Sequence, residues 1–294
     1  NLLPRRAVFF VLVEQGKEGR CCFVMKENKA AQNKTVENST IDNNINNNNK
    51  NNSNNNSNNN VLEIVGLDYF IDEVQILNTP GGLVKIKNKH LDKLNEKQVA
   101  REVALMNQNT IITFPFPSID VVLAGRYPYL GFARGESIED YNIARKYMHY
   151  TNTLKFEKRA ITRVSGGERQ RILFAKILTQ ETDIILLDEP TSNLDIAYEE
   201  QIFTYCRELC GMGKTIVSAM HDLKIASRYC SRLILLKDGE IISDGTIEEV
   251  LTSGNLSKAY GVNALVYRNR ITGLLDFYIP GFEKRKEKKR VHVI

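Results

Sequence analysis

The sequence predicts an α/β fold in which helices cover a largely parallel sheet. Along Val61–Leu251, short apolar runs alternate with longer amphipathic stretches, which is the order of strands and helices in such a sheet. Ile184–Leu187 is apolar throughout and has an Asp on either side, as expected of a strand buried on both faces. Thr215–Ala219 and Leu233–Leu236 are two more runs of this kind, and residues 196–209 between the first two strands have apolar residues at helical spacing.

The part of the chain before this region has a different composition. Of the 20 residues 41–60, 14 are Asn, so this stretch cannot bury a core and is predicted to be a disordered linker. Ala7–Val13 and Cys21–Met25 are β-rich and separated by a turn-prone segment, which makes a hairpin possible within residues 1–40. We expect the α/β domain to span 61–265 and a C-terminal extension with a basic tail to span 266–294.

Composition and charge narrow the class of protein. The longest apolar run, Ala7–Val13, is far shorter than the roughly 20 residues of a membrane-spanning helix, so no such helix is expected. Five cysteines without a Cys-x-x-Cys pair indicate neither a disulfide framework nor a zinc site, and favour a reducing cytosolic compartment. Most of the net charge of +5 comes from residues 283–290, which hold six bases and two acids. A solvated tail explains this charge better than anionic lipid or nucleic acid, so nucleic acid is not an expected partner.

One candidate site lies at a predicted helix N-terminus. Ser165 and Glu168 have the spacing of a capping box in front of an apolar helical stretch, and Gly166 and Gly167 lie in the first turn. Free backbone N–H groups, the helix dipole and the missing Cβ atoms suit such an end to a phosphate. Taken alone, Ser-x-x-Glu is more often an ordinary helix cap.

A second candidate site follows the buried strands. Asp188 and Glu189 come at the carboxyl end of one strand, where two carboxylates are costly unless they meet a cation or a polarised water. One could hold Mg²⁺ and the other could orient or deprotonate an attacking water, as phosphoryl transfer requires. Asp195, before the next helix, could be only an N-cap, and His221 directly after the next strand could be only structural.

Together these motifs resemble the ATP-binding subunit of ABC transporters. Val164–Gln170 (VSGGERQ) resembles the family signature, Ile184–Pro190 (IILLDEP) resembles Walker B with its catalytic Glu, and Ser192–Asp195 (SNLD) resembles the D-loop. His221 resembles the switch histidine, and Gln108 falls where the family has its Q-loop glutamine. The resemblance covers residues 61–265 and implies a P-loop NTPase-like ABC ATPase domain with a helical subdomain that carries the signature.

A finer resemblance is to the ATPases of importers for iron chelates such as siderophores, for haem and for vitamin B12 (cobalamin). It rests on Phe114–Phe116, Asp120–Pro128 and Asp244–Thr246. The resemblance implies two such subunits docked head to tail under two membrane permease subunits, with the Q-loop region touching the permease. It also implies a place in the cytoplasm, peripheral on the inner face of the cell membrane, and an extracytoplasmic substrate-binding protein as an indirect partner.

The resemblance implies a role for each candidate residue, with ATP and Mg²⁺ as cofactors. Glu189 would be the general base, Asp188 and Gln108 would lie at Mg²⁺, and Gln108 and His221 would sense the γ-phosphate. The signature and D-loop residues would contact the nucleotide across the subunit interface: Ser165, Gly166, Gly167, Glu168 and Asp195.

The chain departs from the family in one respect: no Gly-x-x-x-x-Gly-Lys-Ser/Thr (Walker A) occurs in it. Gly213-Lys214-Thr215 does not qualify, because position 208 is Glu. By comparison with the family, a segment on the order of 35 to 40 residues is missing between Asn78 and Thr79. We expect the phosphate cradle to be lost and the sheet to be incomplete. An internal deletion, a damaged or misassembled gene, or a partner that supplies the complete site would explain this, and the start at Asn1 and the end at Ile294 favour a fragment or damaged gene.

Three functions remain to be compared. The first is the importer ATPase. The second, a soluble ABC ATPase in DNA repair or on the ribosome, is disfavoured because the stretch from Gln108 to Ser165 is too short for a coiled-coil insertion. The third is a catalytically inactive or truncated subunit that only dimerises or binds a permease, and the absent Walker A supports it. Pairing with itself and pairing with a complete paralogue both remain open.

Overall fold

A computed structural model describes residues 9–13, 62–65, 69–71, 74–77, 83–108, 110–131, 135–191, 195–237 and 240–280. Within these ranges, no helix has both the length and the hydropathy that crossing a membrane would require. Asn78 and Thr79, where the missing segment was expected, lie outside the described residues, and so do Ser192–Leu194 of the predicted D-loop.

A six-stranded sheet forms the centre of the molecule, in the order β11-β10-β1-β9-β8-β7. Its strands are β1 (Phe9–Val13), β7 (Val103–Met106), β8 (Ile184–Asp188), β9 (Thr215–Met220), β10 (Arg232–Lys237) and β11 (Glu240–Gly245). Strands β7, β8 and β9 are parallel, and β10 and β11 form the hairpin that the Asp-Gly pair at residues 238–239 indicates. The predicted α/β sheet is therefore confirmed.

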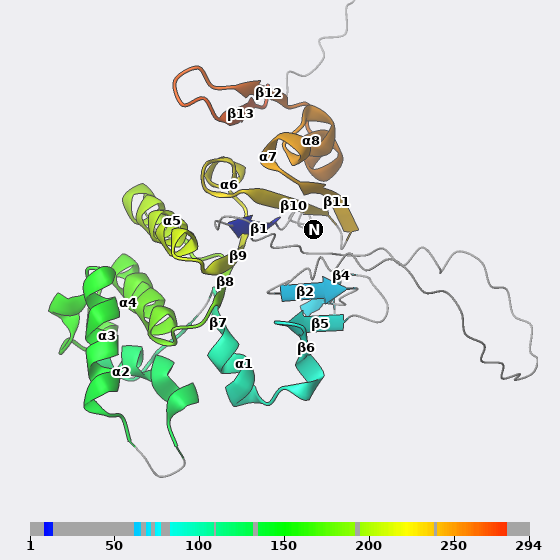
Figure 1. Cartoon of the computed structure of the whole chain (residues 1–294). Coiled ribbons are helices and arrows are strands. Elements are labelled where there is room, and N and C mark those ends of the chain that lie inside the picture. The colour runs from blue at the N-terminus through cyan, green and yellow to red at the C-terminus, as the bar shows by residue number, and fades with distance from the viewer. Residues whose placement is uncertain are drawn as a thin grey trace, which may run out of the picture.

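The N-terminal strand β1 completes this sheet from outside the predicted α/β domain. It lies between β9 and β10 and is antiparallel to both, with Val11 opposite Ser218 on one side and Leu233 on the other (Figure 1). The six-stranded sheet therefore has no open position among its described strands, in contrast to the expected gap. Both edges of β1 are occupied, and the hairpin partner Cys21–Met25 that the sequence suggested lies outside the described residues.

Helices flank the sheet and also form a separate helical part (Figure 1). Helices α2, α3 and α4 pack on one another there, and α5 and α6 connect the strands β8, β9 and β10. The α-helices are α1 (Glu96–Glu102), α2 (Ser118–Leu123), α3 (Ile138–Tyr150), α4 (Gly166–Thr179), α5 (Ile196–Gly211), α6 (Leu223–Tyr229), α7 (Ile247–Val250) and α8 (Ser253–Tyr260). The 3₁₀ segments are η1 (Leu91–Lys93), η2 (Ala124–Tyr129), η3 (Leu154–Phe156) and η4 (Ile161–Arg163). The signature segment starts α4, so the predicted helical subdomain is confirmed.

Smaller sheets lie beside the central one. Strands β2 (Leu62–Val65), β5 (Leu83–Ile86) and β6 (Lys89–His90) form an antiparallel sheet, and β3 (Tyr69–Ile71) pairs with β4 (Val74–Leu77). Ile86 packs with Ile184, Val217 and Ile234 in a small core, whereas the other face of the central sheet belongs to the main core under α4, α5 and α6. The central strands are thus buried on both faces, as their apolar runs predicted.

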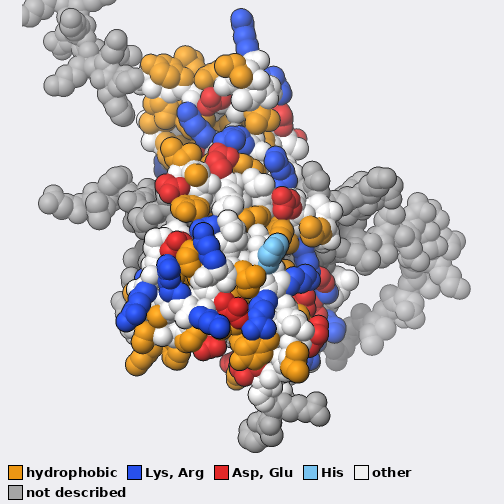
Figure 2. All heavy atoms as spheres, turned by 90° about the vertical axis from the view of Figure 1, so that its left-hand side faces the viewer, with side chains coloured by type: hydrophobic (Ala, Val, Ile, Leu, Met, Phe, Trp, Pro, Cys, Tyr) orange, Lys and Arg blue, Asp and Glu red, His pale blue; other side chains and the backbone are white. Residues whose placement is uncertain are grey.

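The C-terminal extension begins with a hairpin of β12 (Leu265–Arg268) and β13 (Leu275–Tyr278). Val266, Leu275 and Phe277 pack against the main core, and the opposite face leaves large apolar side chains exposed. Figure 2 shows hydrophobic side chains gathered at the upper end of the molecule, where Figure 1 places this hairpin.

The helical part contains a close approach that requires glycine. A Cβ atom on Gly125 of η2 would lie 2.2 Å from the backbone oxygen of Lys176 on α4. We expect Gly125→Ala to lower the free energy of unfolding by about 1–3 kcal/mol, because η2 must move off α4. Gly211→Ala is the control, since a Cβ there meets open space at the end of a helix and should be neutral or stabilising. Urea unfolding of both variants measures this, and equal effects would contradict the close packing of η2.

Candidate functional site

The carboxyl ends of three neighbouring parallel strands bring the predicted site residues together. Met106 of β7 pairs with Leu187 of β8, and Asp188 pairs with Ala219 of β9. Residues that directly follow these strands therefore meet at one edge of the sheet, where α/β folds place their ligands. Gln108 follows β7, Glu189 follows β8 and His221 follows β9.

Both carboxylate oxygens of Glu189 accept hydrogen bonds. Gln108 Nε2 donates to Oε2, and His221 donates from Nε2 to Oε1, because an ionised carboxylate can only accept. The backbone of Glu189 is held in the left-handed region at φ 42°, and its N–H donates to the Ala219 oxygen at 3.0 Å. A non-glycine residue in this region stores strain, which is commonly found at functional sites. The structure thus brings Gln108, Glu189 and His221 together.

Asp188 lies beside this group with its charge incompletely balanced. Burial raises the pKa of its carboxyl, and the neighbouring Glu189 raises it further, although a hydrogen bond from the backbone N–H of Gln108 acts in the opposite direction. A carboxylate in this setting is stabilised by a cation. No cluster of three or more His, Cys, Asp or Glu side chains suited to a metal occurs in the described ranges. Asp188 could contribute a ligand to Mg²⁺, which is usually bound by one or two carboxylates together with phosphates and water.

A small pocket opens next to Glu189 and His221. It has a volume of about 160 Å³ and is lined by both apolar and acidic side chains. Two of its lining residues are joined by a hydrogen bond, in which Thr191 Oγ1 donates to Glu199 Oε1 at 2.9 Å. Neither residue was a candidate from its sequence pattern, although Thr191 follows Asp188–Pro190 directly and Glu199 lies four residues after the N-cap Asp195. The lining residues are Glu189, Thr191, Glu199, Phe203, Met220, His221, Asp222 and Ile225.

The capping box predicted at the start of α4 is present. The Ser165 N–H donates to Glu168 Oε2 at 2.8 Å, and the Glu168 N–H donates to Ser165 Oγ at 3.3 Å. A Cβ on Gly166 would meet open space, so this turn can be approached closely, whereas a Cβ on Gly167 would lie 2.9 Å from the Tyr198 ring. The turn thus offers an accessible helix N-terminus suited to an anion.

Asp195 is an N-cap in this structure, at the start of α5. It accepts a hydrogen bond from the Tyr198 N–H at 3.1 Å. Tyr198 in turn packs on Gly167, so the first turns of α4 and α5 are in contact. Gln170 Nε2, also on α4, donates to the Pro190 oxygen at 2.9 Å. The signature turn is therefore tied to the segment that carries Asp188 and Glu189.

The capping carboxylate predicts a pH-dependent contribution to stability. The hydrogen bond from the Ser165 backbone holds the pKa of Glu168 below its ordinary value of 4.5. A lowered pKa in the folded state stabilises the fold above pH 4.5, and this stabilisation is lost as the pH falls through the lowered value. Glu168→Gln removes the charge and keeps the capping geometry. We expect the difference in unfolding free energy between wild type and Glu168→Gln to shrink below pH 4.5. A pH-independent difference in urea titrations would contradict this.

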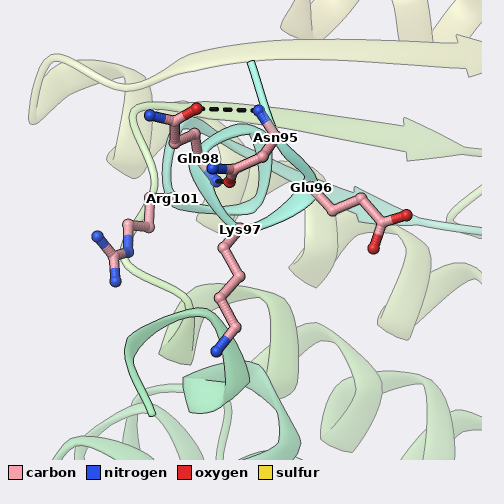
Figure 3. Close-up of a pocket in the computed structure, with 5 residues that line it drawn as sticks. All are labelled: Asn95, Glu96, Lys97, Gln98 and Arg101. Atoms are coloured by element: carbon pink, nitrogen blue, oxygen red, sulfur yellow. Dashed lines mark hydrogen bonds between the residues drawn. The ribbon is translucent and has the colours of Figure 1, made fainter. Parts of the chain in front are cut away.

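A second hollow, of about 540 Å³, is lined by residues of α1 and its N-cap Asn95 (Figure 3). Asn95 and Gln98 form the capping box of α1, and Lys97 extends to the helical part, where its Nζ donates to the Leu130 oxygen at 2.9 Å. Arg101 Nε donates to the Pro128 oxygen at 3.0 Å. The polar groups of this hollow thus support helix capping and the contact between α1 and η2.

Known proteins resemble this chain both in sequence and in fold. A family model described as ABC transporter matches residues 67–192. The hemin import ATP-binding protein HmuV of Streptomyces coelicolor is 34% identical over 194 residues, which are 66% of this chain and 69% of that protein. The ferric enterobactin transport ATP-binding protein FepC of Escherichia coli is 33% identical over 199 residues, 67% of this chain and 73% of that protein. Among solved structures, a chain of an inward-facing ABC transporter superposes with a TM-score of 0.62 at 21% identity, covering 76% of this chain and 98% of that one.

Proposed function

The chain belongs to the ATP-binding proteins of ABC transporters, and we propose that it energises an importer of metal chelates of the iron-siderophore, haem or cobalamin type. Members of this family bind nucleotide and couple ATP hydrolysis to transport. The observation that carries the proposal is the convergence of Gln108, Asp188, Glu189 and His221 at one edge of the parallel sheet. The substrate class rests on the relatives, which include cobalamin as well as hemin and enterobactin proteins.

The proposed chemistry is transfer of the γ-phosphoryl group of bound Mg-ATP to water. Glu189 would orient the water and accept its proton, and it is already held in place by Gln108 and His221. Asp188 would hold Mg²⁺, together with the side-chain oxygen of Gln108, whose amide nitrogen binds Glu189. His221 would keep the Glu189 carboxylate in position at the γ-phosphate. General-base catalysis of this kind contributes about 10²–10⁴-fold to the rate.

The signature turn would act on a nucleotide held by a second ATP-binding subunit. The N–H groups of Gly166 and Gly167 lie at an accessible helix N-terminus, and Ser165 and Glu168 fix its geometry. Asp195 caps α5 by accepting from the Tyr198 N–H, and the Tyr198 ring lies against Gly167 of the signature turn. The second subunit would be either another copy of this chain or a complete paralogue.

The surface after Gln108 would contact the permease subunits. Ile111, Phe114 and Phe116 are 82%, 67% and 51% exposed, and the rings of Phe114 and Phe116 lie 6.0 Å apart. Exposed apolar side chains grouped in this way mark an interaction surface. Docking there would place the chain in the cytoplasm on the inner face of the cell membrane, below a permease that receives its cargo from an extracytoplasmic substrate-binding protein.

A second candidate function is a non-catalytic partner that only pairs with another subunit or with the permease. The observation that favours it is the absence of Gly-x-x-x-x-Gly-Lys-Ser/Thr from the sequence. Without that motif, the chain lacks the backbone cradle and the Lys that neutralise the phosphates in this family. The two candidates differ in whether the chain itself binds and hydrolyses ATP.

Association with the permease tests the importer assignment itself. We expect the chain, co-expressed with the permease subunits of a metal-chelate importer, to co-purify with them and support chelate uptake in cells that lack the resident ATP-binding subunit. Phe114→Glu should reduce co-purification at least tenfold, because it places a charge in the apolar contact. Ile138→Glu is the matched control, since Ile138 is 83% exposed at the start of α3. Co-purification without uptake would favour the non-catalytic partner. A chain that neither co-purifies with the permease subunits nor supports uptake would contradict the importer assignment.

A further inference from the structure

The backbone at Glu189 has a conformation that its local sequence does not favour. Its φ of 42° lies in the left-handed region, where a non-glycine residue is strained. Pro190 follows it, and a proline favours an extended backbone at the residue before it. Contacts with other parts of the fold must therefore hold Glu189 in this conformation.

Two hydrogen bonds hold the backbone on either side of the Glu189 side chain. On the N-terminal side, the Glu189 N–H donates to the Ala219 oxygen at 3.0 Å. On the C-terminal side, Gln170 Nε2 donates to the oxygen of the buried Pro190 at 2.9 Å. The proline ring fixes φ at residue 190, so few torsions remain free between the two bonds. Together the bonds fix the direction in which the Glu189 side chain leaves the backbone.

The donor of the second bond comes from a firmly packed helix. Gln170 lies in the second turn of α4. The next residue, Arg171, is 4% exposed, and its guanidinium lies 4.5 Å from the centre of the Tyr198 ring. Ile172 and Phe174 of the same helix are fully buried in the main core. The backbone of Gln170 is thus a fixed point, from which its side chain holds the residues that follow β8.

We propose that Gln170 is a positioning residue for Glu189 and acts through the Pro190 carbonyl, a role that rests on the proposed function of Glu189 as the general base. Gln108 and His221 hold the carboxylate itself, whereas Gln170 holds the backbone that carries it. Misplacement of a reacting group by about 1 Å can slow a reaction strongly. Loss of the Gln170 bond therefore slows the chemical step and leaves nucleotide binding unchanged.

Gln170→Met tests this role, because Met has the length of Gln and lacks the donor. We expect kcat for ATP hydrolysis to fall about tenfold and KM to change by less than about twofold. In a chain that already carries Glu189→Gln, the same substitution should change turnover by less than about twofold, because the residue through which Gln170 acts has been replaced. A merely structural role would lower turnover in both backgrounds and would overturn the proposal.

Gln180→Met is the matched control. Gln180 makes the same kind of bond at the other end of α4, where its Nε2 donates to the Val103 oxygen at 2.9 Å and to the Ala100 oxygen. Val103 begins β7, whereas Glu189 follows the carboxyl end of β8. The control should therefore keep kcat within about twofold of wild type. An equal fall in kcat for both variants would also overturn the proposal, since it would reflect a general loosening of α4.

Hydrogen exchange of the Glu189 N–H separates this proposal from the proposed function. On the nucleotide-free chain, exchange should be about tenfold faster in Gln170→Met than in wild type and unchanged in Gln180→Met, because the bond to Ala219 opens more often. Unchanged exchange in Gln170→Met would overturn the proposal. If the wild-type chain hydrolyses no ATP, the proposed function fails, and the exchange rate alone supports or overturns the hold of Gln170 on Glu189. If Gln170→Met does not fold, Gln170→Leu, which also lacks the donor, takes its place.

Discussion

We expect Arg126→Ala to lower the free energy of unfolding by about 3–5 kcal/mol, because it leaves the buried Asp140 carboxylate without its ion-pair partner. Arg126 is 8% exposed, and its Nε donates to Asp140 Oδ1 at 2.9 Å. Its Nη1 also donates to the Thr179 backbone oxygen at 3.1 Å and to Glu181 Oε2 at 3.2 Å. The guanidinium lies 4.2 Å from the centre of the Tyr129 ring. One side chain thus connects η2 and α3 to the end of α4, the helix that begins with the signature turn.

Arg145→Ala is the matched control for this prediction. Arg145 pairs with Glu157 at 2.7 Å, but its side chain is 49% exposed, so its removal should cost no more than about 1 kcal/mol. The double variant Arg126→Met with Asp140→Asn should recover part of the loss, because it removes both charges together. Urea unfolding measures all three. A loss below 1 kcal/mol for Arg126→Ala would show that the Arg126–Asp140 pair does not hold the helical part together.

Glu189→Gln is expected to reduce ATP turnover by about 10²–10⁴-fold and to leave nucleotide binding intact or tighter. Gln has the shape of Glu and can still accept from Gln108 or His221, but it cannot take a proton from water. The fold should therefore be unaffected, and the loss should appear in kcat and not in KM. Steady-state phosphate release with purified chain, or with chain bound to its permease, measures this.

Glu157→Gln is the control for the turnover experiment. Glu157 is a partly exposed carboxylate that pairs with Arg145, so its neutralisation tests for a general effect of lost negative charge. Turnover should stay within a factor of two of wild type. Equal turnover of wild type and Glu189→Gln would contradict the role of Glu189 as the general base and would favour the non-catalytic partner.

The motifs that rest on local physics were predictable from the sequence. The strands before Asp188 and His221 were apparent as buried apolar runs, and the Ser165–Glu168 capping box was apparent from its spacing. The position of Gln108 could not be predicted from local sequence in this way. Its place near Glu189, 81 residues away, came from the family resemblance alone, because no local pattern encodes which strands become neighbours.

Long-range pairings account for what the sequence did not reveal. The β-rich run that contains Phe9–Val13 suggested a local hairpin, but the ladder it forms is with strands more than 200 residues away. Apolar alternation indicates that a strand exists and says little about its partner. The ion pair of Arg126 with Asp140 and the bond of Thr191 to Glu199 depend in the same way on how helices are brought together, which side-chain type alone does not predict.

Binding of Mg-ATP to the purified 294-residue chain tests whether this chain is itself an ATPase. Equilibrium binding is measured for wild type and Glu189→Gln, with and without Mg²⁺, and intact mass confirms that the protein is the 294-residue chain of 33.5 kDa. We expect saturable, Mg²⁺-dependent binding that Glu189→Gln preserves or tightens. No binding by either protein, at the correct mass, would contradict ATP hydrolysis by this chain and identify it as a non-catalytic partner in an ABC transporter.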